Sequence, residues 1–317
     1  MLMIIDSGAT KADWRVVRED GTQAGRILTG GMNMSSMTED AIMSVIREAG
    51  AGLEPFRGSI AGVFLYTAGL PTPALRQKLK TALSGMMAPP STGESYGALS
   101  GMMAPSSTGA QSAASGISAT GTTPEVAVEI HDDLTGCARA VCGHKPGIAA
   151  ILGTGSNSCQ FNGEAITAHV DTGGFILGDE GSAAALGKLF VSDLIKGLVP
   201  KEIADAFAQN HDSSYAGIVR NVYHSDGSPS GYLGSLAPFI IGHYAHPYIK
   251  NMVDGNFRAF IDRCLRRYEV DKYPVGIVGG FGYACRHIFG PIAEEAGIKV
   301  SGYIPEPVEG LIKYHTC

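Results

Sequence analysis

Short apolar runs and amphipathic stretches alternate along most of this chain. The runs are rich in Val, Ile, Leu and Ala and end at Gly, Asp or Thr, which is typical of buried strands. Strands are predicted at residues 2–6, 12–18, 24–30, 62–66, 126–130, 148–152, 158–161 and 275–278. Apolar residues at helical spacing predict helices at 38–50, capped by Thr38, and at 73–83 and 132–142. Another helix is predicted to begin near residue 183, and several within 202–270, including one at 257–268. A short helix is predicted at the end of the chain. Such alternation predicts an α/β protein.

Residues 82–122 interrupt this pattern. They are mostly Gly, Ser, Ala, Thr, Pro and Met, with a single charge at Glu94. The octamer Ala-Leu-Ser-Gly-Met-Met-Ala-Pro occurs at 82–89 and again at 98–105. We expect a local duplication or an inserted loop in which neither copy buries a face, and we assign no chemistry to it. A lid over a binding site is the alternative.

Length, charge and cysteine content narrow the class of protein. The 317 residues suggest about two domains, and a composition of 44% hydrophobic and 17% charged residues is that of a globular protein. A net charge of -6 argues against a nucleic-acid partner. The sequence shows no secretory signal and no apolar run of the ~20 residues that span a bilayer. Its six cysteines form no C-x-x-C pair. We therefore expect a cytoplasmic protein with reduced thiols, no zinc site and no membrane contact.

Two loops that combine glycines with hydroxyl side chains each follow a predicted strand. The first contains Ser7, Gly8, Ala9, Thr10 and Lys11, and the second contains Gly153, Thr154, Gly155, Ser156 and Asn157. Glycine lets the backbone turn tightly and approach a ligand, and the exposed N–H groups of such turns bind anions. Ordinary turns rich in small residues are the alternative. We favour phosphate binding because the chain has two such loops.

Acidic residues lie where predicted strands end. Asp6 ends the first strand and suits a hydrated Mg²⁺, which keeps several waters and takes only one or two carboxylates. Between the two loops, strand 126–130 is followed by His131, Asp132 and Asp133. The order of phosphate loop, acidic strand end and second phosphate loop predicts a protein that binds a nucleoside triphosphate from two sides.

These motifs resemble those of the sugar kinase, heat-shock ATPase and actin superfamily, and within it the N-acetylglucosamine kinases and the related BadF-type ATPases. The resemblance covers nearly the whole chain except residues 82–122. The two loops resemble the family's two phosphate motifs. Val278 to Gly282 resembles its adenosine motif, which implies nucleotide contacts for Gly279, Gly280 and Phe281. Pro307 to Leu311 resembles the start of its last connecting helix.

A second group of residues resembles the sugar site of the amino-sugar kinases. The stretch from Gly173 to Ser182 is similar to their Gly-Gly-Trp-Gly…Gly-Asp-Glu-Gly-Ser signature, with Phe175 in place of Trp and Ile176 in place of the next Gly. The sugar contacts that the resemblance implies are Asn33, Ser156, Asn157, Gly174, Phe175 and Asp179. Because of the two departures, the identity of the sugar stays open.

The resemblance also implies the reaction. Asp133 would accept the proton of the sugar's primary hydroxyl, at C6, as that hydroxyl attacks the γ-phosphate of ATP, with Mg²⁺ as the second cofactor. Asp132 competes for this role, and an acidic pair that only stabilises a helix start is the alternative for both. We interpret His131 as structural.

The fold that the resemblance implies is α/β, with two ribonuclease-H-like (actin-like ATPase) domains around a nucleotide cleft. The first would comprise residues 1–145 and 303–317, and the second residues 146–302; a homodimer is left open. One rival function is a BadF-type activator ATPase, which needs cysteines that hold an iron–sulfur cluster. Here Cys137 and Cys142 fall on a predicted helix and Cys159 on a strand, as buried small hydrophobes. A sugar sensor without turnover is the other rival.

Overall fold

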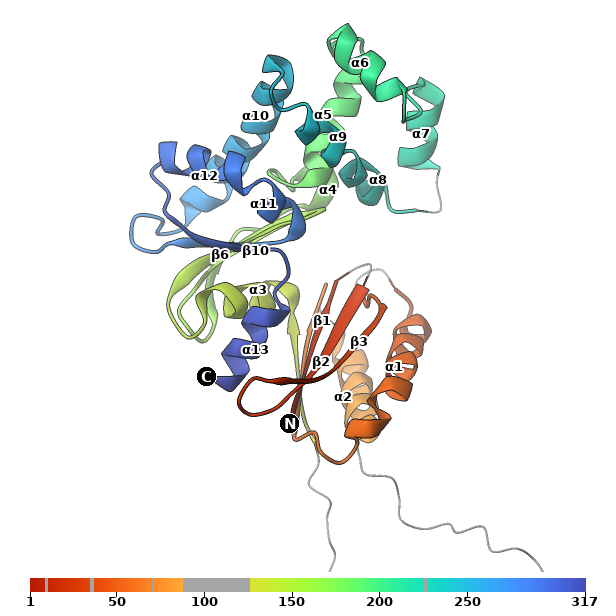
Figure 1. The fold of residues 1–317 in the computed structure, drawn as a ribbon, viewed down its shortest axis with the longest axis vertical. Coiled ribbons are helices and arrows are strands. Elements are labelled where there is room, and N and C mark those ends of the chain that lie inside the picture. Colours follow the sequence, from red (N-terminus) through yellow and green to blue (C-terminus); the bar gives the residue numbers. More distant parts are fainter. Residues whose placement is uncertain (9–10, 35–36, 70, 88–125, 225–226) are drawn as a thin grey trace, which may run out of the picture.

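The chain folds into two lobes, each built on a five-stranded mixed sheet (Figure 1). The computed structural model describes residues 1–317 except 9–10, 35–36, 70, 88–125 and 225–226. The first sheet has the order β3-β2-β1-β4-β5, with β1 antiparallel to β2 and parallel to β4. Its strands are β1 (Leu2–Ser7), β2 (Lys11–Val17), β3 (Gln23–Gly30), β4 (Gly62–Thr67) and β5 (Ala127–Asp132).

Helices cover both faces of the first sheet. On one face, Met3 and Ile5 pack with buried residues of α1 (Glu39–Leu53) and α2 (Pro73–Met87). On the other face, Ile4 packs with Leu311 and Ile312 of α13 (Val308–Thr316). Because both faces of β1 are covered, Met3, Ile4 and Ile5 are fully buried. This explains why the strand is a continuous apolar run.

The second sheet repeats the topology of the first. Its order is β10-β9-β6-β7-β8, with β6 antiparallel to β7 and parallel to β9. The strands are β6 (Gly147–Leu152), β7 (Ser156–Phe161), β8 (Ile166–His169), β9 (Val275–Val278) and β10 (Val300–Ile304). In both sheets an antiparallel hairpin lies on one side of the central strand and parallel strands lie on the other. This is the predicted α/β architecture of two actin-like halves.

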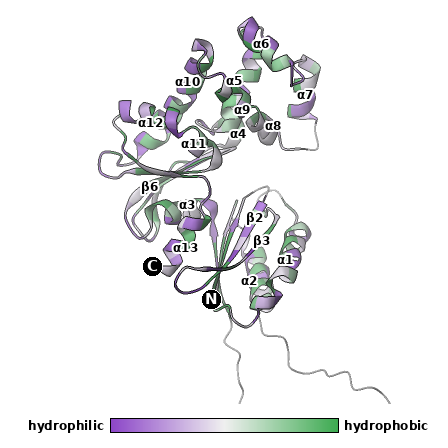
Figure 2. Ribbon diagram, viewed as in Figure 1, coloured by the Kyte–Doolittle hydropathy of each residue, from purple (hydrophilic) through white to green (hydrophobic). Residues whose placement is uncertain are grey.

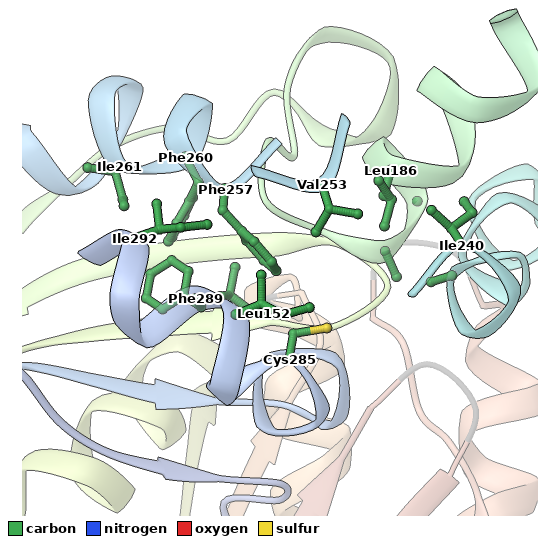
Figure 3. Packing of buried hydrophobic residues seen from close by; sticks show 14 of the residues in the cluster. Leu152, Leu186, Ile240, Val253, Phe257, Phe260, Ile261, Cys285, Phe289 and Ile292 are labelled. Carbon is green, nitrogen blue, oxygen red and sulfur yellow. The ribbon is translucent and has the colours of Figure 1, made fainter. Parts of the chain in front are cut away.

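One face of the second sheet supports a large helical layer. Residues from β6, α5, α10 and α12 form a continuous apolar core, in which Leu152 lies near Phe257 and Cys285 (Figure 3). The helices of this lobe are α4 (Gly174–Leu177), α5 (Ala183–Leu194), α6 (Lys201–Ala208), α7 (Tyr215–Tyr223), α8 (Pro229–Ser235), α9 (Ala237–Gly242), α10 (Pro247–Arg263), α11 (Gly280–Ala284) and α12 (Arg286–Glu295). Two 3₁₀ turns, η1 (Glu54–Phe56) and η2 (Leu265–Arg267), complete the structure.

Helix α3 (Asp133–Cys142) lies between the two sheets. Its Leu134, Cys137 and Ala138 pack on the second sheet, in a cluster with Ala149, Cys159 and Phe161. Hydrophobic and hydrophilic residues alternate along α3 and α1 in Figure 2, as expected for helices that bury one face. The helix that begins at Asp133 therefore contacts both halves of the molecule.

Most predicted elements are present, but one helix has other bounds and two strands were missed. The helix predicted at 257–268 is the second half of α10, which ends at Arg263 and is followed by η2. Strands β8 and β10 were not predicted, because they are short and largely exposed. Strand β10 also crosses the predicted domain boundary between residues 302 and 303. The division into domains stays a proposal.

Residues 82–87 of the first copy of the repeated octamer belong to a helix and not to a loop. Helix α2 continues to Met87, and Leu83 and Met87 are fully buried in the first core. The expectation that neither copy buries a face is therefore wrong for the first copy. The second copy, at 98–105, lies outside the described residues, as does most of the predicted insertion.

None of the helices that the structure describes combines the length and the apolar character that crossing a bilayer requires.

The two helices α3 and α13 approach each other closely at Gly310. A Cβ at this position would lie 2.4 Å from the Ala140 carbonyl oxygen, well inside van der Waals contact. Next to this contact, the Tyr66 hydroxyl accepts a hydrogen bond from Arg139 of α3 (2.8 Å) and shares one with His315 of α13 (2.7 Å). Glycine at position 310 thus allows α13 to return to the first lobe and pack beside α3.

We expect Gly310→Ala to lower the free energy of unfolding by about 1–3 kcal/mol, because the added methyl forces α13 away from α3. Denaturant unfolding would measure this. Gly255→Ala in α10 is a matched control, since a Cβ there meets nothing within 4 Å. The control should be neutral or stabilising by up to about 1 kcal/mol, from helix propensity. Equal stability of Gly310→Ala and the wild type would contradict the packing argument.

Candidate functional site

Asp6 and Asp133 lie at the same edge of the first sheet. Strands β1 and β5 both run parallel to β4, so their carboxyl ends meet on one side. The register places Asp6 level with Tyr66 and Ser7 level with Thr67, and Asp133 follows directly after β5. The predicted metal ligand and the predicted base are thus carried by strands on either side of β4.

Both carboxyl groups hold their protons more tightly than usual. Burial, with the charges of Asp13, Glu306 and Asp133, raises the pKa of Asp6 to about 7, although Lys11 opposes this. Burial, with the charge of Asp132, raises the pKa of Asp133 to about 6. Desolvation of a carboxylate is costly, and raised pKa values of this kind are common in sites that bind or react.

The structure distinguishes Asp132 from Asp133. Asp132 is the N-cap of α3, and its carboxylate accepts a hydrogen bond from the Thr135 N–H (2.7 Å). Asp133 occupies the next position, in the first turn, without that capping role. The capping interpretation therefore fits Asp132, which leaves Asp133 as the candidate base. His131 stacks on Tyr66 and pairs with Glu129, as expected of a structural residue.

The first predicted phosphate loop is closed by a backbone hydrogen bond from Gly8 N–H to the Lys11 carbonyl (3.0 Å). Ala9 and Thr10 lie outside the described residues. The Lys11 ammonium pairs with Glu306, in the linker between β10 and α13. Sequence reasoning missed Glu306, although its flanking prolines, Pro305 and Pro307, mark a rigid segment.

Ser7 supports the loop that carries Asn33. Its buried hydroxyl accepts a hydrogen bond from the Met32 N–H (2.8 Å), and Thr67 donates to the Met32 carbonyl (2.7 Å). Asn33 then forms a β-bridge with Ala68. The ends of β1 and β4 thus hold Asn33 beside the edge that bears Asp6 and Asp133. This geometry gives Ser7 a role in positioning that loop, and its predicted phosphate contact stays a prediction.

A buried charge cluster that the sequence analysis missed lies beside Asp6. Asp13, directly opposite Asp6 on β2, is 2% exposed and accepts two hydrogen bonds each from Arg15 and Arg26 (2.7–3.1 Å). Burial alone would raise the pKa of Asp13, but the two guanidinium groups outweigh it and lower the pKa. Arg15 also donates to Glu309 of α13 (3.1 Å). Asp13 and Arg15 are two positions apart on a strand and therefore share one face of the sheet. This spacing was the sequence signal that could have indicated their ion pair.

The second predicted phosphate loop is held by the start of α5. The amides of Ala183 and Ala184 donate to the carbonyls of Gly153 and Thr154 (both 3.0 Å). Gly153 N–H donates to the Gly155 carbonyl (2.9 Å), which closes the turn. The first amides of the helix are therefore used to fix the loop, and its shape is set before any ligand binds.

Asp179 lies against this loop in a strained conformation. It is the one non-glycine residue with positive φ (59°) among those that the structure describes, a conformation uncommon outside glycine, asparagine and aspartate. Burial raises the pKa of Asp179, and a hydrogen bond from the Ser156 N–H opposes the rise. A Cβ on Gly155 would lie 3.0 Å from Asp179 Oδ2. Two predicted sugar contacts, Asp179 and Ser156, are thus brought together, and backbone strain of this kind often marks functional sites.

Other predicted sugar contacts are engaged locally. The Asn157 side chain accepts from the Ser158 N–H (2.9 Å) and pairs with His169 on β8 (3.0 Å). Gly174 is exposed with φ of 65°, and Phe175 packs partly on the second core. Lys188 donates to the Phe175 carbonyl (2.7 Å) and holds α4 against α5.

The predicted adenosine motif packs directly on the second phosphate loop. Gly279 has φ of 122°, and a Cβ there would lie 2.4 Å from the Leu152 carbonyl oxygen and 3.4 Å from Gly153 N. Only glycine allows this approach. Nothing lies within 4 Å of a Cβ on Gly280, so the backbone there is open to a ligand. Phe281 packs on Phe257, with 5.8 Å between ring centroids, and so anchors the motif to the core.

A groove of about 680 Å³ lies elsewhere in the second lobe. Residues of α4, α5 and α10 line it, including Leu177, Leu189 and Met252, with Glu180 and Arg263 paired at 2.7 Å. Asp6, Asp133 and Asp179 do not line it. The groove thus borders the Gly173–Ser182 stretch through Ile176, Gly178 and Glu180, but none of the three aspartates selected for chemistry or binding lines it.

The donor set at Asp6 fits a hydrated magnesium ion better than a metal held by protein alone. Among the described residues, no three His, Cys, Asp or Glu side chains are arranged to bind a metal. Asp6 and Asp133 supply only carboxylate oxygens, and a magnesium ion that keeps its waters and binds phosphates needs few protein ligands. Cys137, Cys142 and Cys159 are near one another but lie in or against an apolar cluster, and burial raises the pKa of each thiol.

We expect Asp6→Asn to stabilise the protein at pH 8. The pKa of Asp6 is raised, so its stabilising contribution is complete below about pH 4 and is lost as pH rises through about 7. At pH 8 the wild type therefore holds an unfavourable charge, and the variant should gain on the order of 2 kcal/mol, with a smaller gain at pH 5. Unfolding by denaturant at both pH values tests this. Asp271→Asn, at an exposed residue, is the control and should show no such gain at pH 8 over pH 5.

Searches of protein-family models and of curated proteins found no match to the chain. Among solved structures, the chain is similar to a proposed N-acetylglucosamine kinase from Porphyromonas gingivalis, with 33% identity and a TM-score of 0.83. That match covers 100% of this chain and 99% of the other. A proposed N-acetylglucosamine kinase from Chromobacterium violaceum has 16% identity and a TM-score of 0.68, with 99% of each chain covered.

A more distant similarity extends the fold to another group of sugar kinases. A ROK family glucokinase from Streptomyces griseus, in complex with glucose and AMPPNP, has 13% identity and a TM-score of 0.54. The match covers 99% of this chain and 97% of that chain. At such identities, the two distant matches show a shared fold.

Proposed function

This chain belongs to the N-acetylglucosamine kinase family of the sugar kinase, heat-shock ATPase and actin superfamily, and we propose that it transfers the γ-phosphate of ATP to the 6-hydroxyl of N-acetylglucosamine. The observation that carries the proposal is the position of Asp133. It starts α3 beside Asp6, while its neighbour Asp132 is committed to capping the helix. The full-length similarity to a proposed N-acetylglucosamine kinase supports the substrate class.

Asp133 would act as the general base. Its pKa of about 6 leaves it ionised at neutral pH and still basic enough to take a proton. The 6-hydroxyl would give its proton to Asp133 as its oxygen bonds to the γ-phosphorus. The bond from phosphorus to the β–γ bridging oxygen would break, and ADP would leave. Such transfers depend mostly on position and charge, which suits a site with few reactive groups.

The nucleotide would be held from both lobes. Gly8 and Lys11 in the first loop and Gly153 to Gly155 in the second would hold the phosphates, with Gly279 and Gly280 against the adenosine. Bound Mg²⁺ would neutralise charge on the phosphates, and Asp6 would hold it through oxygen. The preformed second loop supports this assignment because donors that are already oriented need not reorganise during the reaction.

The sugar would be recognised by partly buried polar groups. Asn33 from the first lobe and Asp179 from the second are the principal candidates, with Ser156 and Asn157 beside Asp179. A site built to pair a substrate hydroxyl discriminates strongly against analogues that lack it, because its own polar groups are then left unpaired. The strained backbone at Asp179 supports its selection for function over local stability.

Two rivals have specific tests. An activator ATPase would need an iron–sulfur cluster, but the apolar surroundings of Cys137 and Cys159 favour inert thiols. Iron in the purified protein would favour that rival. A sugar sensor without turnover would keep its function after Asp133→Asn.

We expect ATP-dependent phosphorylation to be fastest with N-acetylglucosamine among four sugars, the others being glucosamine, N-acetylmannosamine and glucose. Asp133→Asn should lower kcat by at least about 100-fold, because the base is lost. Asp132→Asn is the matched control, since Asn caps helices as well as Asp does, and should retain most of the activity. Coupled detection of ADP measures both. No turnover of any sugar by the wild type would refute the kinase proposal.

A second prediction concerns Asp179. Asp179→Asn should preserve the fold, because Asn tolerates positive φ, and should lower kcat/KM for the sugar by about 10- to 100-fold through loss of a charge-assisted hydrogen bond. Glu180→Gln is the control, because Glu180 faces the groove and pairs with Arg263. An unchanged kcat/KM in Asp179→Asn would remove Asp179 from the sugar site.

A further inference from the structure

The ion pair between Lys11 and Glu306 joins two parts of the chain that are distant in sequence. Lys11 begins β2, directly after the first phosphate loop. Glu306 belongs to the linker between β10 of the second sheet and α13, which packs on the first sheet. The pair therefore ties the phosphate loop of one lobe to the segment that arrives from the other.

Glu306 and Lys11 differ in conformational freedom. Glu306 lies between Pro305 and Pro307; Pro307 restricts the backbone of Glu306, and Pro305 has a fixed φ of its own. Lys11 has a long side chain that is 57% exposed, so its ammonium can move. Exposed ion pairs of this kind contribute little to stability and exchange readily for a better partner. The polyanionic phosphates of a nucleotide are such a partner for a lysine beside a phosphate loop.

The carboxylate of Glu306 also lies at the first predicted phosphate loop. Lys11, with which it pairs, closes the turn of that loop, because the Lys11 carbonyl accepts the Gly8 N–H (3.0 Å). An anion that arrives at this loop therefore meets the carboxylate of Glu306 and must also draw the Lys11 ammonium away from it. Both effects oppose nucleotide binding and neither involves the sugar.

We infer that Glu306 is a positioning residue that holds the Lys11 ammonium while no nucleotide is bound and gives it up to the phosphates. The inference rests on the proposed function, because it takes Lys11 as a phosphate contact. The linker is then released from the phosphate loop only when a nucleotide is present. The affinity for nucleotide is consequently lower than it would be without the ion pair between Lys11 and Glu306.

The test is Glu306→Gln, with AMPPNP binding measured by calorimetry and ATP turnover measured on N-acetylglucosamine. We expect the Kd for AMPPNP and the KM for ATP to fall about two- to fivefold, which is what loss of an exposed ion pair allows. The kcat and the KM for the sugar should not change. If Glu306 were only structural, its substitution would not change nucleotide binding while leaving kcat and the KM for the sugar unchanged.

Glu39→Gln is a matched control. Lys78 and Glu39 form another cross-element pair of the first lobe, with exposures of 58% and 45% against 57% and 42% for Lys11 and Glu306. Removing the Glu39 charge should leave AMPPNP binding unchanged. An equal gain in Glu39→Gln would mean that general charge accounts for the effect, and would overturn the inference.

A double-mutant cycle with Lys11→Met isolates the pair. In the Lys11→Met background, Glu306→Gln should change the Kd for AMPPNP less than in the wild type. Equal changes in both backgrounds, no change, or weaker binding in Glu306→Gln would overturn the inference. A protein that binds AMPPNP but phosphorylates no sugar would refute the kinase proposal alone, since the binding ratios still decide the role of Glu306. Absence of AMPPNP binding in the wild type would overturn both.

Discussion

The contact of α3 with α13 is the constraint on which the rest of the structure depends. Helix α3 packs on the second sheet through Cys137 and Ala138 and meets α13 at Ala140, where only glycine fits at position 310. Because Asp133 starts α3, the candidate base is fixed relative to both sheets at once. A shift of either sheet against this helix would change the position of that carboxylate relative to the second phosphate loop.

The carboxylates at this edge of the first sheet differ in whether arginines pair with them. Asp13 is the most buried carboxylate at this edge, and two arginines compensate it fully. Asp6, opposite Asp13 on the neighbouring strand, and Asp133, at the same edge of the sheet, have no arginine partners in the described part of the chain, and their pKa values rise. Desolvation of a carboxylate is costly unless a positive partner compensates it, which is why the pKa values of Asp6 and Asp133 rise while that of Asp13 falls.

The helices and strands were predicted well from the sequence where local chemistry decides them. Thr38 caps α1, and the apolar runs of β1, β6 and β9 form buried strands, because burial and capping leave direct signals. The α/β fold also followed from the resemblance. The sequence left the cap open between Asp132 and Asp133, because it did not fix where the helix begins; the structure gives the cap to Asp132, and the role of Asp133 stays a prediction.

What the sequence could not predict are contacts between distant segments. Glu306 and Lys11 are 295 positions apart, and nothing in the local pattern of either residue indicates the other. The four hydrogen bonds to Asp13 depend on strand register, which puts Arg15 and Arg26 level on neighbouring strands. Met87 looked like part of a low-complexity stretch, but tertiary packing made it core. The strain at Asp179 likewise arises from its surroundings.

The position of the repeated octamer bears on how this protein can be engineered. Helix α2 ends at Met87, and β5 begins at Ala127, level with Gly62 at the amino end of β4. Asp6 and Asp133 lie at the opposite, carboxyl end of the same strands. The start of β5 at Ala127 is thus a full strand length from the reacting groups. Chain added directly before Ala127, as a reporter or an affinity tag, would enter the first lobe at the end of the sheet opposite to those groups.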